Sequence, residues 1–388
     1  MSKFSFSDEQ MYVIESALKM IKSPDEDLFE ISGIAGSGKS TVFHKIVEDS
    51  GLERVLGCAI TGQAVSVLQS KGVRAKTIHS LIYDLYTTSS TERFNEYLDI
   101  PKTELAFRKK ETLEDIDLLL IDEAYMIDED IARDIKSFKH IKKIACGDFF
   151  QLPPVSGNPG FLTSKNVFRL LKPFRQSETS GIYLLANDII NNIRYFDKSY
   201  NDVEFLRFKN MDLECILDYD VILCCTNKMK DYFNLKYREL KQLNTDLPSH
   251  GERVIFKKNN ARIRFKEISL VNGMVGTVIG ESFKCDKNSF VIHFKPDMID
   301  EILPIKCDYN YFKADMNKKK FMKSYAKYSN GEYLEYAYAA TVHSYQGSQN
   351  KRCMFIDESY LFENHVRKAL QYTAVTRATD KFTWVRIK

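Results

Sequence analysis

The sequence predicts an α/β protein in which parallel strands alternate with helices and at least two domains share the chain. Three observations predict this class. An apolar stretch at 28–31 leads into a glycine-rich loop and then a helix. Continuous apolar runs recur at 118–121 and 221–226, as in strands that are buried on both faces of a parallel sheet. The chain also has 388 residues, which is more than one hydrophobic core usually serves.

The composition is that of a soluble globular protein, with 44% hydrophobic and 28% charged residues. Nothing resembles a signal peptide, and no apolar run approaches the roughly 18 residues that a membrane span requires. We therefore expect a cytoplasmic protein without a membrane partner. The eight cysteines lack C-x-x-C spacing, so neither structural zinc nor disulfides are expected.

Positive charge is concentrated in one part of the chain. Between Arg253 and Lys327, 16 Lys and Arg residues stand against 8 Asp and Glu residues, whereas the whole chain carries a net charge of only +3. A local excess of this kind suits a polyphosphate partner, because each neutralised phosphate releases counterions. A merely solvated face would look the same, so charge alone leaves both interpretations open.

The run Gly33–Thr41 matches the pattern G-x-x-x-x-G-K-S between a strand and a helix, and it predicts a triphosphate cradle. Glycines let the loop curl with its N–H groups inward, and the anion then rests at a helix N-terminus. Lys39 is expected to reach the β/γ oxygens, and the Ser40 hydroxyl is expected to ligate Mg²⁺. The expected nucleotide contacts of the loop are Gly33, Ala35, Gly36, Ser37, Gly38, Lys39, Ser40 and Thr41.

An acidic pair, Asp122-Glu123, follows the apolar run at 118–121. In open α/β sheets, ligands bind at the carboxyl ends of the strands, which is where this pair would lie. We expect Asp122 to hold the Mg²⁺ that Ser40 also touches, and Glu123 to deprotonate the water that attacks the γ-phosphate. Alone, such a pair is more often a solvated strand end or a helix cap, and only the nearby cradle favours the catalytic interpretation.

Elements around these motifs can be placed from local signals. Ser7 and Gln10 match a capping box, so the first helix should begin after Ser7. A strand at 54–60 continues the β-α-β pattern, and the polar stretch from Tyr83 to Glu114 has no clean periodicity, so we interpret it as an insertion.

A second α/β unit is predicted from the strand at 221–226 and an amphipathic helix at 229–243. Short strands then interrupt it, and Asn272-Gly273 predicts a two-residue hairpin turn between two of them, within a small β-barrel. The predicted short strands are 254–256, 263–265, 275–279 and 290–294.

Together these motifs resemble the RecD-like DNA helicases of superfamily 1B, with an order and spacing most similar to the small phage helicases of the Dda type. The segments that carry the resemblance are 33–41, 122–123, 147–155, 174–176, 341–347 and 372–378. It implies two RecA-like P-loop domains with parallel sheets, plus a small inserted SH3-like β-barrel and a short pin insertion called 1B. The implied bounds are 1–82 and 115–172 for domain 1A, 83–114 for the pin or wedge insertion 1B, 173–251 and 337–388 for domain 2A, and 252–336 for the basic insertion 2B.

The resemblance also implies catalytic roles. Gln151 would sense the γ-phosphate and its attacking water, and it follows a strand of the same sheet as the acidic pair. Arg175 and Arg377 would reach the γ-phosphate from the second domain as arginine fingers, which stabilise charge in the transition state. The catalytic set is therefore Lys39, Glu123, Gln151, Arg175 and Arg377.

Further roles follow from the same resemblance. Gln10 would contact adenine, and its capping role is compatible with that contact. Gln346 and Gly347 would bind nucleotide and couple the cleft to the strand-binding surface. Hydroxyls and imidazoles at strand ends can hold phosphates without reading sequence, although such residues are more often turn or cap residues. The implied DNA contacts are Thr61, Thr77, His79, Thr341 and His343.

The function expected on these grounds is an ATP-dependent DNA helicase that moves 5′ to 3′ on single-stranded DNA and unwinds duplex. ATP and Mg²⁺ are the expected cofactors. Single-stranded DNA and single-strand/duplex junctions are the expected partners, with single-strand-binding or replication proteins as candidates, and the chain should act as a monomer. The alternative is a nucleic-acid-stimulated ATPase that remodels nucleoprotein complexes without unwinding; a small-molecule kinase would leave Arg377 and the basic region unexplained.

Overall fold

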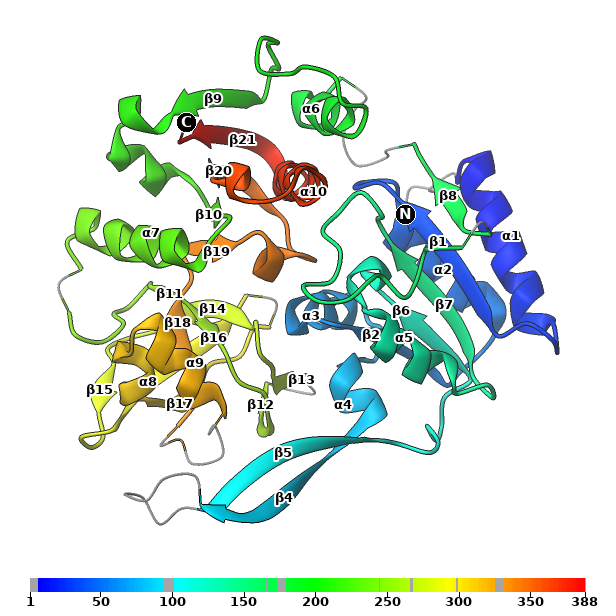
Figure 1. Ribbon diagram of the computed structural model, residues 1–388, viewed down its shortest axis with the longest axis horizontal. Coiled ribbons are helices and arrows are strands. Elements are labelled where there is room, and N and C mark those ends of the chain that lie inside the picture. The colour runs from blue at the N-terminus through cyan, green and yellow to red at the C-terminus, as the bar shows by residue number, and fades with distance from the viewer. Residues whose placement is uncertain are drawn as a thin grey trace.

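The structure is a computed structural model that describes residues 6–93, 101–164, 166–172, 179–243, 245–265, 268–297, 299–324, 329 and 331–387. Two parallel β-sheets lie side by side, each with helices on both faces, and an antiparallel sheet adjoins the second of them (Figure 1). The prediction of an α/β protein with two parallel-sheet domains is confirmed. No helix in the described part of the chain is long and apolar enough to cross a membrane.

The first domain has a six-stranded sheet with the order β3-β2-β6-β7-β1-β8, in which every neighbouring pair is parallel. Its strands are β1 (Leu28–Gly33), β2 (Val55–Ala59), β3 (Ala75–Thr77), β6 (Leu118–Ile121), β7 (Lys142–Gly147) and β8 (Phe168–Leu170). All four residues of β6 are buried, as its apolar run predicted. The nucleotide loop and the acidic pair therefore lie on the same side of this sheet, where β1 and β6 have their carboxyl ends.

Helices cover both faces of this sheet. They are α1 (Asp8–Lys22), α2 (Lys39–Ser50), α3 (Gly62–Ser70), α4 (Ile78–Ile82) and α5 (Glu129–Lys136). The predicted capping box is present at the start of α1, where Ser7 and Gln10 exchange backbone and side-chain hydrogen bonds. One apolar core joins α1 and α2 to the sheet, and a second core joins α4 and α5 to its other face.

A two-stranded hairpin projects from the first domain. Its strands are β4 (Tyr83–Arg93) and β5 (Pro101–Lys109), which pair antiparallel. The hairpin lies within the predicted insertion 83–114. It extends away from the first sheet, toward the antiparallel sheet that adjoins the second domain (Figure 1). Its role as a strand-separating pin stays a prediction.

The second domain has a five-stranded sheet with the order β19-β10-β20-β21-β9, again parallel throughout. Its strands are β9 (Val203–Arg207), β10 (Val221–Cys224), β19 (Ala339–Thr341), β20 (Asn350–Asp357) and β21 (Ala378–Arg386). Its helices are α6 (Gly181–Ile190), α7 (Asn227–Leu240) and α10 (Asn364–Val375). The core on one face contains Trp384 and the apolar side of α10, so the segment just before Arg377 is firmly anchored.

The inserted unit is antiparallel. The chain passes from the second domain into this unit through its first strand and returns through its last strand, and these two strands pair. Its strands are β11 (Arg253–Phe256), β12 (Asn260–Phe265), β13 (Ile268–Leu270), β14 (Val275–Val278), β15 (Phe283–Lys284), β16 (Ser289–Pro296), β17 (Leu303–Asp308) and β18 (Leu334–Tyr336). Two short helices, α8 (Tyr309–Lys313) and α9 (Met316–Ser324), follow β17. An SH3-like character of this unit stays a prediction, as do the bounds of the domains.

The hairpin turn predicted at Asn272-Gly273 is wrong. The two residues do form a turn, and Gly273 has a φ of +94°, but the turn joins β13 to β14, which do not pair. β13 pairs with β12, whereas β14 pairs with β11 and β16. The dipeptide specifies a tight turn, and long-range packing decides which strands pair across it.

Candidate active site

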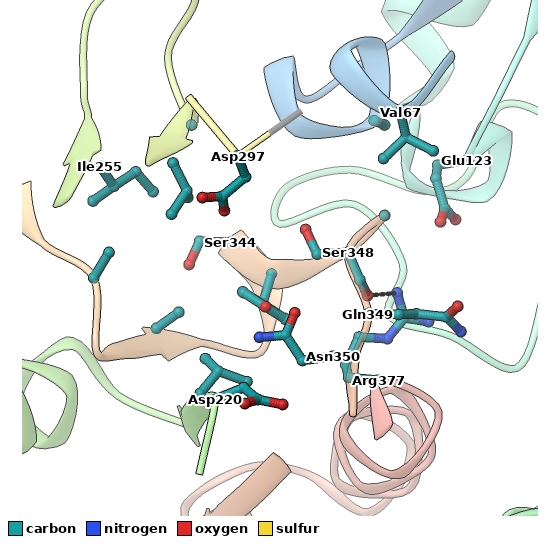
Figure 2. A pocket seen from close by; sticks show the side chains of 18 of the residues that line it. Val67, Glu123, Asp220, Ile255, Asp297, Ser344, Ser348, Gln349, Asn350 and Arg377 are labelled. Atoms are coloured by element: carbon teal, nitrogen blue, oxygen red, sulfur yellow. Dashed lines mark hydrogen bonds between the residues drawn. The ribbon is translucent and has the colours of Figure 1, made fainter. Parts of the chain in front are cut away.

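A cavity of about 400 Å³ lies where the two parallel-sheet domains and the inserted antiparallel unit meet. The first domain contributes the loop residues Ala35, Gly36, Ser37, Gly38, Lys39 and Ser40, together with Asp122, Glu123 and Gln151. The second domain contributes Gly347, Ser348, Gln349, Asn350 and Arg377. Figure 2 shows Glu123 and Arg377 entering the same space from opposite sides. The structure therefore brings together residues that are more than 200 positions apart in the sequence.

The glycine loop has the backbone geometry that its sequence predicted. Gly36 and Gly38 adopt φ values of +79° and +81°, which favour glycine because a Cβ is strained there. At Gly33 a Cβ would lie 2.4 Å from the Ser37 Oγ, so the loop closes tightly on itself. Gly38 is also the N-cap of α2 and has no side chain to bond the first amides of that helix. The Thr41 N–H donates to the Gly38 carbonyl at 2.9 Å, but no side chain caps this helix start, which suits an anion.

Two side chains, those of Lys39 and Gln10, donate hydrogen bonds to carbonyl oxygens of the loop. The Lys39 ammonium donates to the carbonyl oxygens of Gly33 at 2.7 Å and Ile34 at 3.1 Å. The Ser37 hydroxyl is fully buried and has no hydrogen-bond partner among the described residues. Gln10 is buried and donates to the Ser37 carbonyl at 3.1 Å, so its amide supports the loop. The predicted adenine contact of Gln10 stays a prediction.

The acidic pair lies beside the loop, where β6 ends. The Asp122 Oδ1 accepts the Glu123 N–H at 2.9 Å, and Glu123 has a φ of +51°, which is uncommon for a residue with a side chain. Burial raises the pKa of both carboxyl groups, and the neighbouring Asp122 raises the pKa of Glu123 further. Arg377 and Lys39 oppose that increase in the pKa of Glu123. A carboxylate with a raised pKa is a stronger base, which suits the predicted role of Glu123.

The segment after β7 places a buried carboxylate, Asp148, next to Gln151, which lines the cavity. Asp148 is 1% exposed, and its pKa is raised by burial, although Lys39 and a hydrogen bond from Tyr372 work against that increase. The Gln151 Nε2 donates to the Asp148 Oδ2 at 3.4 Å, while the Gln151 Oε1 has no partner among the described residues. Gln151 lines the cavity, and its side chain carries a buried acceptor that the described residues leave unused.

Arg377 follows α10 and is 3% exposed. Its guanidinium donates to the carbonyls of Thr373 and Ser348 and to the Thr376 hydroxyl, each at 3.1 Å. These bonds hold a cation on the part of the cavity wall that the second domain supplies (Figure 2). Arg175, the second predicted arginine finger, lies outside the described residues, so its role stays a prediction.

Several hydrogen bonds cross between the domains beside the cavity. The Leu152 N–H donates to the Thr373 Oγ1 at 3.1 Å, and the Gln346 Nε2 donates to the Leu152 carbonyl at 3.4 Å. The Tyr372 hydroxyl also reaches the first domain. The sequence assigned a coupling role to Gln346 but none to Tyr372 or Thr373, because no local pattern marks which residues of a helix face another domain.

Four of the five predicted DNA contacts lie in two segments that fold alike. Thr77-Ile78-His79-Ser80 begins at the last residue of β3, and Thr341-Val342-His343-Ser344 begins at the last residue of β19. Each of these strands is an edge strand of its sheet. In both segments the threonine hydroxyl donates to the serine hydroxyl, at 2.9 and 3.0 Å, and the serine donates back to the threonine carbonyl. Burial lowers the pKa of both histidines. The repeat is visible in the sequence, but four residues are too few to distinguish it from chance.

The remaining predicted DNA contact, Thr61, caps α3 by accepting the Ala64 N–H at 3.3 Å. Gly347 packs against the same turn, because a Cβ at Gly347 would lie 3.1 Å from the Ala64 Cβ. The start of α3 thus touches the loop that carries Gln346. This contact links the cavity to the strand ends where the predicted DNA residues lie.

The glycine loop, the acidic pair and an arginine from a facing domain define a P-loop nucleotide hydrolase built from two RecA-like domains. A protein-family model described as an AAA domain matches residues 6–182. The ATP-dependent DNA helicase Pif1 of Campylobacter jejuni is 25% identical over 91% of this chain and 87% of its own length. The chain is thus similar to a Pif1 helicase over nearly its whole length.

Solved structures show the same fold. A structure of two coordinating Pif1 helicases at forked double-stranded DNA matches 98% of this chain and 92% of its own, with a TM-score of 0.61 and 18% identity. Bacteroides Pif1 in complex with ADP-AlF3 and single-stranded DNA matches the same shares, with a TM-score of 0.56 and 18% identity. The particular likeness to the Dda-type phage helicases stays a prediction.

Proposed function

We propose that this protein is an ATP-dependent DNA helicase that moves 5′ to 3′ along single-stranded DNA and unwinds duplex. The observation that carries the proposal is the cavity between the domains, where Lys39 and Glu123 face Arg377. Because the cavity has a wall in each domain, a nucleotide held there would draw the domains together, and its hydrolysis would release them.

The relatives support the choice of ATP and DNA. The similar helicase of Campylobacter jejuni is described as an ATP-dependent DNA helicase. The Bacteroides structure holds ADP-AlF3 and single-stranded DNA, and the two coordinating Pif1 helicases act at forked duplex. Single-stranded DNA and single-strand/duplex junctions are therefore the partners that we propose.

The residues of the cavity fit ATP with Mg²⁺. The Ser40 hydroxyl and the Asp122 carboxylate line the same cavity and are hard oxygen ligands, which Mg²⁺ prefers in combination with phosphate oxygens. Bound there, Mg²⁺ would neutralise charge on the phosphates. The unpartnered Ser37 hydroxyl and the uncapped start of α2 suit an anion at the loop.

Each side chain then has a defined task. Lys39 leaves the carbonyls of Gly33 and Ile34 and binds the β/γ oxygens. Glu123 takes a proton from the attacking water, and Gln151 orients that water through its unused acceptor. Arg377 stabilises the charge that develops on the γ-phosphoryl group, and Arg175 is proposed as a second cation with the same task.

DNA would be gripped by one segment from each domain. The Thr-x-His-Ser segments after β3 and β19 place similar hydroxyls and imidazoles at the edge strands of the two sheets. Phosphate contacts of this kind hold a strand without reading its sequence. When the domains approach and separate, the two grips would alternate along the strand. The hairpin β4–β5 is the proposed pin at the junction, and the proposed domain bounds are those predicted from the sequence.

Strand displacement tests the proposal most directly. The protein should hydrolyse ATP faster when single-stranded DNA is present, and it should displace a strand from a duplex with a 5′ tail but not from one with a 3′ tail. Absence of stimulation by single-stranded DNA would contradict the proposal. Stimulated hydrolysis without strand separation on either substrate would instead favour a remodelling ATPase.

A further inference from the structure

The Tyr372 hydroxyl contacts two parts of the first domain at once. It donates to the Asp148 Oδ2 at 2.8 Å and accepts the Ala35 N–H at 3.2 Å. Tyr372 is 2% exposed and Asp148 is 1% exposed, so water does not compete for either bond. A hydroxyl has a single proton to donate, and here that proton is committed to a buried carboxylate. The bond pair therefore joins the two domains through one oxygen atom.

The three residues in this contact belong to three working parts of the site. Ala35 lies in the glycine loop, and Asp148 begins the segment that carries Gln151. Tyr372 lies on α10, whose end carries Arg377. The Arg377 Nε donates to the carbonyl of Thr373, the residue next to Tyr372. A shift of the Tyr372 hydroxyl would therefore displace the Arg377 guanidinium, because one turn of helix connects the two residues.

Neighbouring contacts make this connection stiff. The Tyr372 ring meets the Phe150 ring edge to face, with centroids 5.9 Å apart. Leu152 is bonded on both sides of its peptide, to Thr373 through its N–H and to Gln346 through its carbonyl. The segment 148–152 is therefore fixed to α10 at both of its ends. Side chains that are locked in this way transmit small displacements, because packed interiors do not deform freely.

We infer that Tyr372 is a positioning residue through which the state of the glycine loop sets the position of Arg377. The inference rests on the proposed ATP hydrolysis. When phosphate occupies the loop, the loop amides turn toward the anion, and the Ala35 N–H that Tyr372 holds moves with them. The hydroxyl follows, and α10 brings Arg377 toward the γ-phosphate. Tyr372 touches no reacting atom and acts only by placing Arg377.

Tyr372→Phe tests this inference, because it removes the hydroxyl and keeps the ring that packs on Phe150. Tyr200→Phe is the matched control. The Tyr200 hydroxyl donates to the Asp188 Oδ2 at 2.6 Å, both residues are buried, and the bond lies wholly inside the second domain. Each substitution removes one hydrogen bond from a tyrosine to a buried carboxylate. Tyr372→Phe also removes the bond that the hydroxyl accepts from the Ala35 N–H, so it should lose somewhat more thermal stability than Tyr200→Phe.

The expected result is a difference in kcat. Tyr372→Phe should lower the kcat of single-strand-stimulated ATP hydrolysis about tenfold, with a change in the KM for ATP of less than about threefold. Tyr200→Phe should keep the wild-type kcat. A wild-type kcat in Tyr372→Phe, or an equal loss in both variants, would overturn the inference, because a purely structural bond predicts no difference between the two.

A second measurement needs only nucleotide binding. Hydrogen exchange is followed with and without ADP in the glycine loop and in α10. In the wild type and in Tyr200→Phe, ADP should change exchange in both places, whereas in Tyr372→Phe it should change only the glycine loop. A response of α10 in Tyr372→Phe equal to that of the wild type would overturn the inference. A wild-type protein without DNA-stimulated hydrolysis would instead defeat the proposed function, and the exchange result would still decide the role of Tyr372.

Discussion

Each of the two parallel-sheet domains has a buried strand that leads into a helix, but the two helix starts are built differently. In the first domain β1 leads to α2 through the glycine loop, and the N-cap Gly38 offers no side chain to the helix amides. In the second domain β10 leads to α7 through Thr226, whose hydroxyl accepts the Met229 N–H at 3.2 Å. The start of α2 therefore has no side-chain cap and can bind an anion, whereas the Thr226 side chain caps the start of α7.

The comparison shows why domains of the same architecture can divide one reaction. A self-capped helix cannot offer the same amides to phosphate, so the second domain has no cradle at α7. It contributes Arg377 instead, held on carbonyls at the cavity wall. The function of each domain is therefore set by a few loop residues on a shared framework.

Arg377→Ala asks whether the second domain takes part in hydrolysis at all. At saturating ATP we expect kcat to fall about a thousandfold, because an arginine that stabilises the transferring phosphoryl group has an effect of this order. Single-turnover hydrolysis in the presence of DNA measures it. Arg194→Ala is the control, since the Arg194 side chain is 83% exposed and pairs only with nearby Asp197 among the described residues. An unchanged rate in Arg377→Ala would remove this residue from the site.

Glu123→Gln tests the acidic pair of the first domain. It should lower kcat about a hundredfold or more while ATP binding and single-strand binding persist, because the amide keeps the shape of the side chain but cannot accept a proton. Steady-state hydrolysis and fluorescent-nucleotide titration separate the two effects. Glu129→Gln, on the exposed first turn of α5, should leave both quantities unchanged. Normal hydrolysis by Glu123→Gln would show that another group is the base.

Gly38→Ala tests the open helix start itself. Its φ of +81° makes a Cβ unfavourable by about 1–2 kcal/mol, and the distorted loop should weaken ATP binding about tenfold or more. Gly51, at the other end of α2, has a φ of +65°, and a Cβ added to it would meet no other part of the chain within 4 Å. Gly51→Ala should therefore cost a similar amount of stability and keep ATP affinity. Calorimetric titration and thermal unfolding compare the two, and equal ATP affinities would mean that Gly38 has no special role.

Thr226→Ala tests the closed helix start and should have the smallest effect. Losing the cap of α7 should lower the free energy of unfolding by about 1 kcal/mol, and the kcat for ATP hydrolysis should not change. Denaturant unfolding and an ATPase assay measure these quantities. A large loss of hydrolysis in Thr226→Ala would show that the start of α7 contributes to the nucleotide site after all, and the contrast between the two domains would fail.

The local features of the site could be predicted from the sequence. The loop Gly33–Thr41, the strand that carries Asp122-Glu123 and the capping box of α1 depend on residues close together in the chain, whose conformational preferences are visible there. The turn at Asn272-Gly273 shows the limit of such signals, since the turn formed but the strands on its two sides found other partners. Strand pairing depends on contacts across the whole inserted unit.

Contacts between the domains had no local signal. Tyr372 and Thr373 belong to a segment that the sequence singled out, yet only the structure shows that both reach segment 148–152. The similar folding of the two Thr-x-His-Ser segments also became clear only when each was found at an edge strand.

Local sequence patterns specify the chemical groups of this protein: which loop can cradle phosphate, which carboxylates and which arginine are available, and that parallel sheets would carry them. The tertiary structure alone decided which of these groups meet. Arg377 faces Glu123 because two separately packed sheets lie against each other, and Tyr372 bonds Asp148 and Ala35 because α10 is anchored in that interface. The physical reason is that backbone preferences act over a few residues, whereas burial and hydrogen bonding between domains depend on the arrangement of the whole chain.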